Sequence, residues 1–322
     1  MKKSQTLFLT LLDEWLERRK EQVKLSTYCK YEQLIRLHIK PYFEGETCSS
    51  ISQESIQKFY EALKQNPEGK SSLSTTSLRC VCMILNSTLD YGYERKHLRI
   101  QLKLSPKLSR EYHLVHVFSQ ENQWLLEQYI FDHPTPYASA ILLALYSGIR
   151  IGELCALKYD DLNLTDGYLK IVHTVQRSIV VSPNDKNHKK TELVILEPKS
   201  KSSYRLIPLP NFMISYLKEH LLFSESHPYI FSKSGITPLD PRTLQYFYKK
   251  TLEKIQVPYL NFHCLRHTFA TRCITLGWDI RTLSEILGHA DIKITMEYYF
   301  HSSMEYKKMQ MQKFEPLIQQ AG

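Results

Sequence analysis

The sequence has no apolar run that could cross a membrane. A membrane span needs roughly 18 or more consecutive apolar residues. The first apolar stretch meets Asp13 and Glu14 before a span, or the core of a signal peptide, could form. The sequence therefore predicts a protein that stays in the cytoplasm. With 43% hydrophobic and 23% charged residues over 322 positions, the chain is too apolar for disorder and can form one large or two medium domains.

Cysteine and glycine are too scattered for three common kinds of site. The seven cysteines include no CxxC pair, are odd in number and lie mostly in apolar segments. Reduced structural thiols are therefore expected, and neither disulfides nor a thiolate zinc site is indicated. The ten glycines form neither a phosphate-binding P-loop nor a dinucleotide fingerprint. We expect no cofactor and no bound metal.

Positive charge is in excess, with a formal net charge of +9 and a sequence pI near 9.0. Residues 1–118 carry 19 Lys and Arg against 13 Asp and Glu, so the N-terminal third is more basic than the rest. A basic surface of this kind favours a polyanion such as DNA as partner. Charge alone is equally compatible with a basic enzyme that binds no nucleic acid.

The N-terminal part is expected to be an all-α domain over residues 1–100. Apolar residues recur at helical spacing over residues 6–20, 26–40 and 52–63. After the breaker-rich segment QNPEGKSSLS, Ser74 or Thr75 is suited to cap a long fourth helix. The basic segment that follows contains Pro106 and has no sustained helical period, so residues 101–118 are expected to be a linker.

Residues 119–322 are expected to form a second domain with both helices and strands. Helical patterns follow Ser119, and then come three segments of strand-like composition, GYLKIVHTVQ, TELVILEP and SYRLIPLP. The fold class predicted for the whole chain is therefore mainly α with a small antiparallel β-sheet. A last amphipathic helix is predicted from Met311, Phe314, Leu317 and Ile318, which could pack on its own domain or on a neighbouring protomer.

Four polar clusters lie in apolar surroundings in this second domain, where charged groups need partners or a function. They are Arg150 with Glu153, Lys199 with Lys201, His263 with Arg266 and His267, and His289 followed by Tyr298 and Tyr299.

Two of these clusters can address one anion. Arg150 directly follows an apolar helix, with Glu153 about one turn away, although a purely structural ion pair fits the same spacing. His263 and Arg266 are three residues apart and share a helical face. His263 and His267 also have metal-ligand spacing, but the sequence lacks the Glu of an HExxH motif and a third ligand, so a metal site is disfavoured.

The tyrosine pair has a chemical reading and a structural one. Tyrosine is a poor nucleophile at neutral pH because its free pKa is about 10. It can attack a phosphodiester if cations stabilise the phosphate charge and an acid protonates the leaving oxygen. Two arginines, a lysine and two histidines form such a set. Most tyrosine pairs at a helix edge only pack, so these neighbours carry the functional reading.

At this point the motifs resemble a known family. GIRIGEL, PKSKSSYRLIPL, HCLRHTFAT, LGHADIKIT and the tyrosine after them are similar, in order and spacing, to the motifs of the tyrosine recombinases, the phage-integrase family. The resemblance covers residues 119 to about 301, and residues 1–95 are similar to the family's helical core-binding domain. Each motif is weak alone, and five in the same order are specific.

The resemblance implies a role for each member of the first two clusters. Arg150 matches the first catalytic arginine, and Glu153 matches the carboxylate that orients the side chains beside it. Lys199, in the loop between two strands, would be the general acid for the 5′ oxygen. Lys201 lies two residues further on and could take that place.

The resemblance also assigns the remaining clusters. His263 and Arg266 match the HxxR motif, with Arg266 as the second phosphate clamp, and His289 would hydrogen-bond the phosphate. The family's nucleophile typically lies nine positions after that histidine, which selects Tyr298. The Tyr-x-His pattern fits with one extra residue, so Tyr299 is the minority candidate.

The implied function is site-specific recombination of DNA through a covalent 3′-phosphotyrosyl intermediate, without ATP or a metal. The role would be integration or excision of a mobile element, or inversion of a DNA segment, in a bacterium or phage and at the nucleoid. The implied partners are double-stranded recombination sites, a tetramer of the protein itself, and an accessory DNA-bending or directionality factor. Alternatives are a catalytically inactive DNA-binding regulator and relaxation of DNA by a type IB topoisomerase-like reaction.

Overall fold

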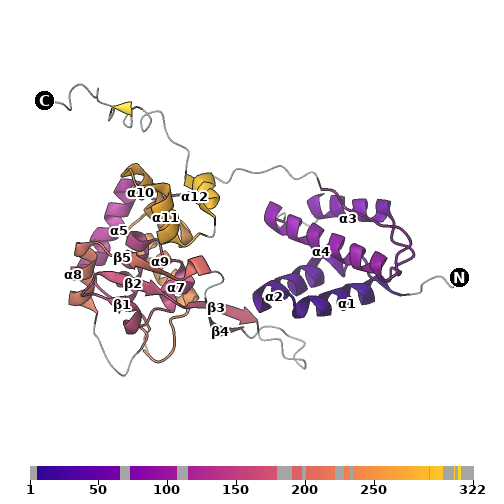
Figure 1. Ribbon diagram of the computed structural model, residues 1–322, viewed down its shortest axis with the longest axis horizontal. Coiled ribbons are helices and arrows are strands. Elements are labelled where there is room, and N and C mark those ends of the chain that lie inside the picture. The colour runs from indigo at the N-terminus through magenta and orange to yellow at the C-terminus, as the bar shows by residue number, and fades with distance from the viewer. Residues whose placement is uncertain are drawn as a thin grey trace. The chain divides into compact units, whose positions relative to one another are not determined.

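The computed structural model describes most of the chain as two compact units (Figure 1). The described residues are 6–65, 73–106, 115–179, 191–197, 201–221, 228–232, 235–289, 291–299, 308 and 311–312, without the side chains of 65, 179, 201, 294 and 297–299. One unit contains Met1–His113 and Ser178–Thr191, and the other contains Leu114–Arg177 and Glu192–Gly322. Among the described helices, none is long and apolar enough to cross a membrane.

The first unit is a bundle of helices. Its elements are α1 (Phe8–Lys20), α2 (Leu25–Leu34), the π-helical turn η1 (Ile35–Ile39), α3 (Gln53–Gln65) and α4 (Thr75–Glu94). Five apolar residues of α1 recur at helical spacing and are buried, namely Phe8, Leu11, Leu12, Trp15 and Leu16. Ser74 caps α4 by accepting a hydrogen bond from the amide of Ser77.

The segment after α4 stays packed on this unit as far as Leu104. The side chains of Leu98, Leu102 and Leu104 belong to the buried core of the bundle. The amide of Leu104 donates to Oδ1 of Asn86, at 2.8 Å. The first residues of the segment expected to be a linker are therefore structural parts of the bundle.

The second unit surrounds one apolar helix. Its helices are α5 (Gln120–Asp132), α6 (Pro136–Ser147), α7 (Ile151–Cys155), α8 (Asn211–His220), α9 (Pro241–Lys254), α10 (His263–Thr275), α11 (Ile280–Leu287) and α12 (Ile292–Tyr299), with short turns η2 (Tyr159–Asp161) and η3 (Lys201–Ser203). Helix α6 is buried almost all round because α5, α8, α9 and α10 pack against it. Its start is set by the side chain of Thr135, which caps it, and by Pro136 in the first turn.

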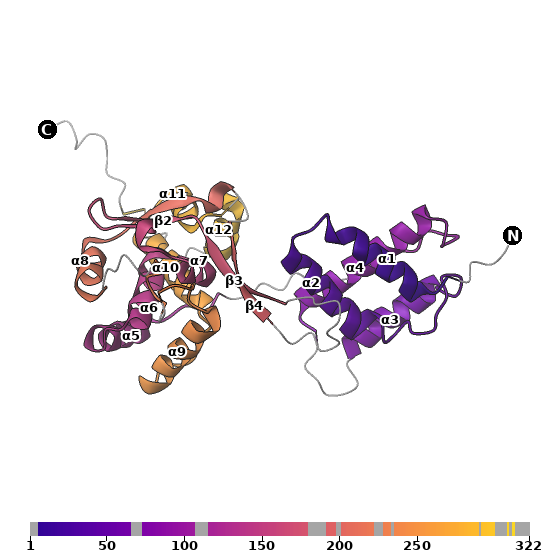
Figure 2. The ribbon, with the colours of Figure 1, turned by 90° about the horizontal axis from the view of Figure 1, so that it is seen from below.

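The strands form two small sheets. They are β1 (Leu162–Asn163), β2 (Tyr168–Ile171), β3 (Thr174–Ile179), β4 (Thr191–Leu196) and β5 (Arg205–Pro208). The order β1-β2-β5 is antiparallel, with Leu169 opposite both Leu162 and Ile207. Strands β3 and β4 pair separately, as a two-stranded ribbon (Figure 2). The predicted class, mainly α with a small antiparallel sheet, is confirmed, although GYLKIVHTVQ is divided between the two sheets.

Gly148 ends α6 and brings three helices close together. It has a left-handed φ of +63°, and a Cβ there would lie 2.6 Å from Cδ1 of Phe269 on α10 and 2.8 Å from Cδ2 of Leu287 on α11. Both the backbone conformation and the contacts therefore require glycine at this position.

We expect Gly148→Ala to lower the free energy of unfolding of the second unit by about 2–4 kcal/mol, from left-handed strain and overpacking together. Gly167→Ala is the matched control, because Gly167 also has a positive φ but meets only the mobile end of Ile214. The control should lose only about 1–2 kcal/mol. Urea unfolding followed by tryptophan fluorescence measures both, and equal losses would contradict the packing argument.

Candidate active site

The candidate residues come together where α11 ends. Helices α10, α11 and α12 pack against one another (Figure 1). Arg150 precedes α7, Arg266 lies on α10, and His289 follows α11 directly. Hydrogen bonds connect all three to the backbone or side chains at this helix end. The fold therefore assembles residues that are up to 139 positions apart in the chain.

Glu153 holds Arg150 through both its backbone and its side chain. Oε2 of Glu153 accepts the Arg150 amide at 3.0 Å, and Oε1 accepts from Nη1 at 2.9 Å. Nη2 of Arg150 donates to the carbonyl of Gly288 at 3.2 Å. The Arg150 side chain is still 35% exposed, whereas that of Glu153 is 5% exposed. Glu153 and the Gly288 carbonyl thus hold part of the guanidinium in place. Its solvent-exposed part can bind an anion.

Arg266 is almost completely buried, with 2% of its surface exposed. Its Nη1 donates to the carbonyl of Gly148 and its Nη2 to that of Leu287, each at 2.7 Å. Nη2 also lies 2.8 Å from Nε2 of His289. Backbone oxygens therefore compensate much of the cost of burying this charge.

The surroundings of His289 determine where its proton lies. An arginine can only donate, so Nε2 of His289 accepts from Arg266 and the neutral ring carries its proton on Nδ1. Nδ1 then donates to Oγ1 of Thr295 on α12, at 2.8 Å. Burial, followed by the charges of Arg266 and Arg150, lowers the pKa of His289 to about 3. The ring is therefore neutral near neutral pH, and it connects α10 to α12.

His263 and His267 form an edge-to-face pair at the start of α10, with ring centroids 4.6 Å apart. Partial burial, with His267, Arg266 and Arg150 nearby, lowers the pKa of His263. The residues that the structure describes contain no group of three or more metal-ligating side chains. This pair accordingly has no third ligand among them.

The four remaining candidates are placed only in part. Lys199 lies outside the described residues. Lys201 begins the turn η3, and Tyr298 and Tyr299 form the end of α12, but the side chains of these three also lie outside the described part. Helix α12 begins at Ile292, three residues after His289, and both tyrosines lie in its last turn.

Sequence reasoning missed Arg205, the first residue of β5. Its guanidinium binds both carboxylate oxygens of Glu153, at 3.2 and 2.8 Å, and its side chain is 5% exposed. Burial alone raises the pKa of Glu153, but the hydrogen bonds and charges of Arg205 and Arg150 hold it below its usual value. Strand alternation was the available signal, because it places Arg205 on the same face as the buried Ile207.

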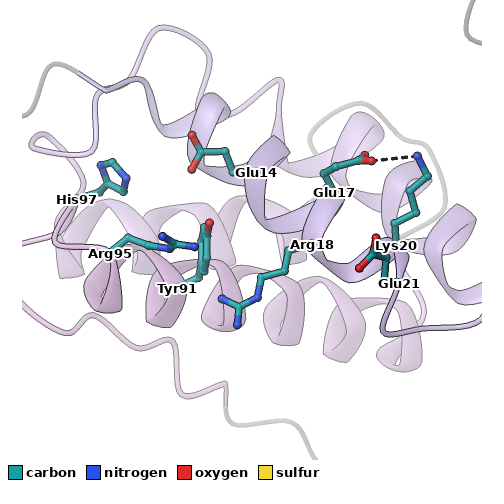
Figure 3. Close-up of a pocket in the computed structure, with 8 residues that line it drawn as sticks. All are labelled: Glu14, Glu17, Arg18, Lys20, Glu21, Tyr91, Arg95 and His97. Carbon is teal, nitrogen blue, oxygen red and sulfur yellow. Dashed lines mark hydrogen bonds and ion pairs between the residues drawn. The ribbon is translucent and has the colours of Figure 1, made fainter.

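A large hollow of about 760 Å³ lies elsewhere, on the first unit between α1 and α4 (Figure 3). The ring of Tyr91 lies between the guanidinium groups of Arg18 and Arg95, at 5.6 and 5.4 Å. Three glutamates in and directly after α1 offset the positive charges that line it, namely Glu14, Glu17 and Glu21. A lining of mixed charge is a poor site for a phosphate, so this hollow is not the reaction site.

Comparisons with known proteins agree with this geometry. Residues 119–306 match the model of the phage integrase family, and residues 7–64 match the N-terminal SAM-like domain of phage integrases. A tyrosine recombinase XerC-like protein of Caldanaerobacter subterraneus subsp. tengcongensis is 30% identical over 312 residues, which are 90% of this chain and 78% of that protein.

Two solved structures share the fold at lower identity. The Tn1549 transposon integrase in complex with a circular intermediate DNA has a TM-score of 0.75 and 19% identity, covering 97% of this chain and 100% of that one. A lambda integrase tetramer bound to a Holliday junction has a TM-score of 0.63 and 15% identity, covering 90% and 76%. The family match extends over more than half of the sequence, so this chain belongs to the phage integrase family of tyrosine recombinases.

Proposed function

We propose that this protein cuts and rejoins DNA at specific sites, with Tyr298 as the nucleophile. The observation that carries the proposal is the convergence of Arg150, Arg266 and His289 at the end of α11, next to the helix that carries the tyrosines. A phosphodiester gains negative charge as it is attacked. Two fixed guanidinium groups stabilise that charge without having to reorganise.

The bonds formed and broken in the proposed reaction balance without a cofactor. A bond forms between the tyrosine oxygen and phosphorus, and the bond between phosphorus and the 5′ oxygen breaks. The tyrosine gives its proton to solvent, and Lys199 or Lys201 gives one to the departing 5′ oxygen. A 5′-hydroxyl from another strand then reverses both steps. The energy of the phosphodiester is retained in the tyrosine link, so rejoining requires no ATP.

His289 is suited to hydrogen bonding with the phosphate. Burial and the neighbouring cations keep the ring neutral and make it a weak base, so it is poorly suited to abstract a proton. The hydroxyl of Thr295 can accept from Nδ1 or donate to it. The ring can therefore change tautomer when a phosphate oxygen takes the Arg266 hydrogen, and present an N–H at Nε2 without losing Thr295.

The choice of Tyr298 depends on register. It lies nine positions after His289, the spacing that the family resemblance favours. Helical periodicity places both 298 and 299 on the side of α12 that carries Thr295, three and four residues later. The helix alone does not distinguish the two tyrosines, and register is what selects Tyr298.

DNA binding is assigned to both parts of the chain. Residues 1–100 would form the core-binding domain, 101–118 a basic linker and 119–322 the catalytic domain. The mixed charge of the hollow beside α1 offers phosphates no uniformly positive surface, so the first unit should contact DNA through another face. A tetramer on two paired sites is supported by the shared fold with the lambda integrase tetramer on a Holliday junction. An accessory DNA-bending or directionality factor would be a further partner.

The proposed biological role is integration and excision of a mobile element, or inversion of a DNA segment, at the nucleoid. The fold shared with a transposon integrase supports the first of these. The presence of Arg150, Arg266 and His289 in one cluster argues against an inactive regulator, because a protein that only binds DNA has no need of it.

A covalent adduct tests the nucleophile. Tyr298→Phe should abolish the denaturant-resistant adduct with a nicked suicide DNA substrate, since the attacking oxygen is gone. Tyr299→Phe is the matched control and should retain it. Adducts are scored by gel after denaturation, and loss of the adduct in the control alone would move the nucleophile to position 299. The DNA site itself can be found by sequencing fragments that wild type, but not Tyr298→Phe, holds covalently.

Product topology separates recombination from relaxation. With two copies of the captured site on one plasmid, we expect deletion or inversion of the intervening DNA, according to the orientation of the sites. Restriction mapping of the products measures this, and a one-site plasmid is the control. Relaxation without exchange between two sites would instead assign a topoisomerase reaction.

The pKa of His289 predicts how stability changes with pH. An unfolded histidine has a pKa of about 6.5, whereas the folded ring of His289 has a pKa of about 3. Between these two values the unfolded chain binds a proton at this position and the folded protein does not. Stability is therefore lost as the pH falls from about 6.5, by roughly 1–2 kcal/mol at pH 5 for this group.

His289→Gln should remove this part of the pH dependence, since glutamine does not titrate. Urea unfolding at pH 7.5 and 5 measures it, in a Trp15→Phe background that leaves Trp124 and Trp278 of the second unit as reporters. An identical pH dependence in the variant and the parent would mean that His289 is charged in the folded protein.

A further inference from the structure

Arg205 is a buried arginine whose hydrogen bonds connect three separate parts of the site. Nη1 and Nη2 bind the carboxylate of Glu153, at 3.2 and 2.8 Å. Nε donates to the carbonyl of Ile286 at 2.6 Å, and Nη1 also donates to that of Ser203 at 3.1 Å. One guanidinium therefore joins α7, the last turn of α11 and the end of η3.

The position of Arg205 keeps it away from the substrate. Its side chain is 5% exposed, against 35% for Arg150 on the other side of Glu153. Four of its five N–H hydrogens are used by the carboxylate and the two carbonyls. A phosphate that met Arg150 would meet an exposed guanidinium, whereas Arg205 has no comparable free face.

Arg205 keeps the carboxylate of Glu153 ionised. A carboxylate that is 5% exposed is costly to keep ionised unless nearby cations compensate for its lost hydration. Arg150 is half-exposed and contributes one side-chain hydrogen bond to Glu153, whereas Arg205 contributes two from within the protein. Without Arg205, Glu153 would gain a proton more readily and hold Arg150 less firmly.

Arg205 also fixes the turn that begins with Lys201. That turn, η3, ends at Ser203, whose carbonyl Arg205 binds two residues before its own position. A Cβ on Gly288 would lie 3.0 Å from Cδ and Nη1 of Arg205 and 3.0 Å from the carbonyl of Ser202. The backbone of η3 and the guanidinium are therefore packed directly against the residue before His289.

We propose that Arg205 is a positioning residue for strand cleavage, which fixes the lysine-bearing turn η3 and the Glu153–Arg150 pair against the end of α11. It acts through these neighbours and does not touch the reacting atoms. The inference rests on the proposed cleavage reaction, because it matters only if Lys199 or Lys201 protonates the leaving oxygen and Arg150 binds the phosphate.

A substrate that needs no general acid isolates this role. Replacing the bridging 5′ oxygen by sulfur gives a leaving thiol with a pKa of about 8.5, which departs as a thiolate without being protonated. The phosphorus–sulfur bond then breaks with its electron pair on sulfur, while the tyrosine–phosphorus bond forms as before. Misplacing a lysine should slow cleavage of the oxygen substrate and affect the sulfur substrate much less.

The experiment compares the two cleavage rates within one sample of Arg205→Gln, on the captured DNA site. We expect a loss of about 100-fold on the oxygen substrate and about 10-fold on the sulfur substrate, from small displacements of the reacting groups. Because both rates come from the same sample, their ratio does not depend on how much of the variant is folded. A ratio equal to that of wild type would overturn the proposal and leave Arg205 with a stability role only.

Three further variants calibrate the ratio. Arg150→Lys should slow both substrates equally, because it acts on the phosphate charge. Whichever of Lys199→Ala and Lys201→Ala removes the general acid should give the largest difference between the substrates. Arg281→Gln removes an exposed arginine at the other end of α11 and should leave both rates unchanged. If wild type formed no adduct with either substrate, the proposed function itself would fail, which is a separate outcome.

Discussion

The site depends on how the last turn of α11 is capped. The carbonyl groups of residues 286–288 each accept a hydrogen bond from a different arginine, respectively Arg205, Arg266 and Arg150. The final carbonyls of a helix have no partner within it, and they carry the negative end of its dipole. Three guanidinium groups donate hydrogen bonds to these carbonyls. The same hydrogen bonds fix the orientation of all three arginine side chains.

This arrangement explains how so much positive charge can be held together in one place. Three arginines within one cluster repel each other, and the carboxylate of Glu153 binds two of them. The backbone oxygens of α11, with that of Gly148, supply the remaining compensation. His289 lies just after the capped turn, where burial, followed by the charges of the same arginines, lowers its pKa and keeps the ring neutral. The capping arginines therefore contribute to its protonation state.

Much of this could be predicted from the sequence, and what could not has a physical reason. Helical periodicity and the order of the motifs predicted the fold class and drew attention to Arg150, Arg266 and His289. Strand pairing was not predictable, since GYLKIVHTVQ, residues 167–176, has the composition of one strand, yet β2 pairs with β1 and β5 while β3 pairs with β4. Arg205 was missed because an arginine in a short strand usually faces solvent, and its carboxylate partner lies 52 positions earlier in the chain.

The same capping has a consequence for catalysis. Of the contacts that hold Arg150 and Arg266, those to backbone carbonyls and to Glu153 are compatible with a phosphate bound as proposed. In that proposal, the hydrogen bond from Arg266 to Nε2 of His289 is exchanged for one to a phosphate oxygen. Thr295 would keep the ring oriented during that exchange, from the helix that carries the two tyrosines. The repulsion between the arginines is therefore compensated when the protein folds, and little further reorganisation of these side chains is needed in the transition state.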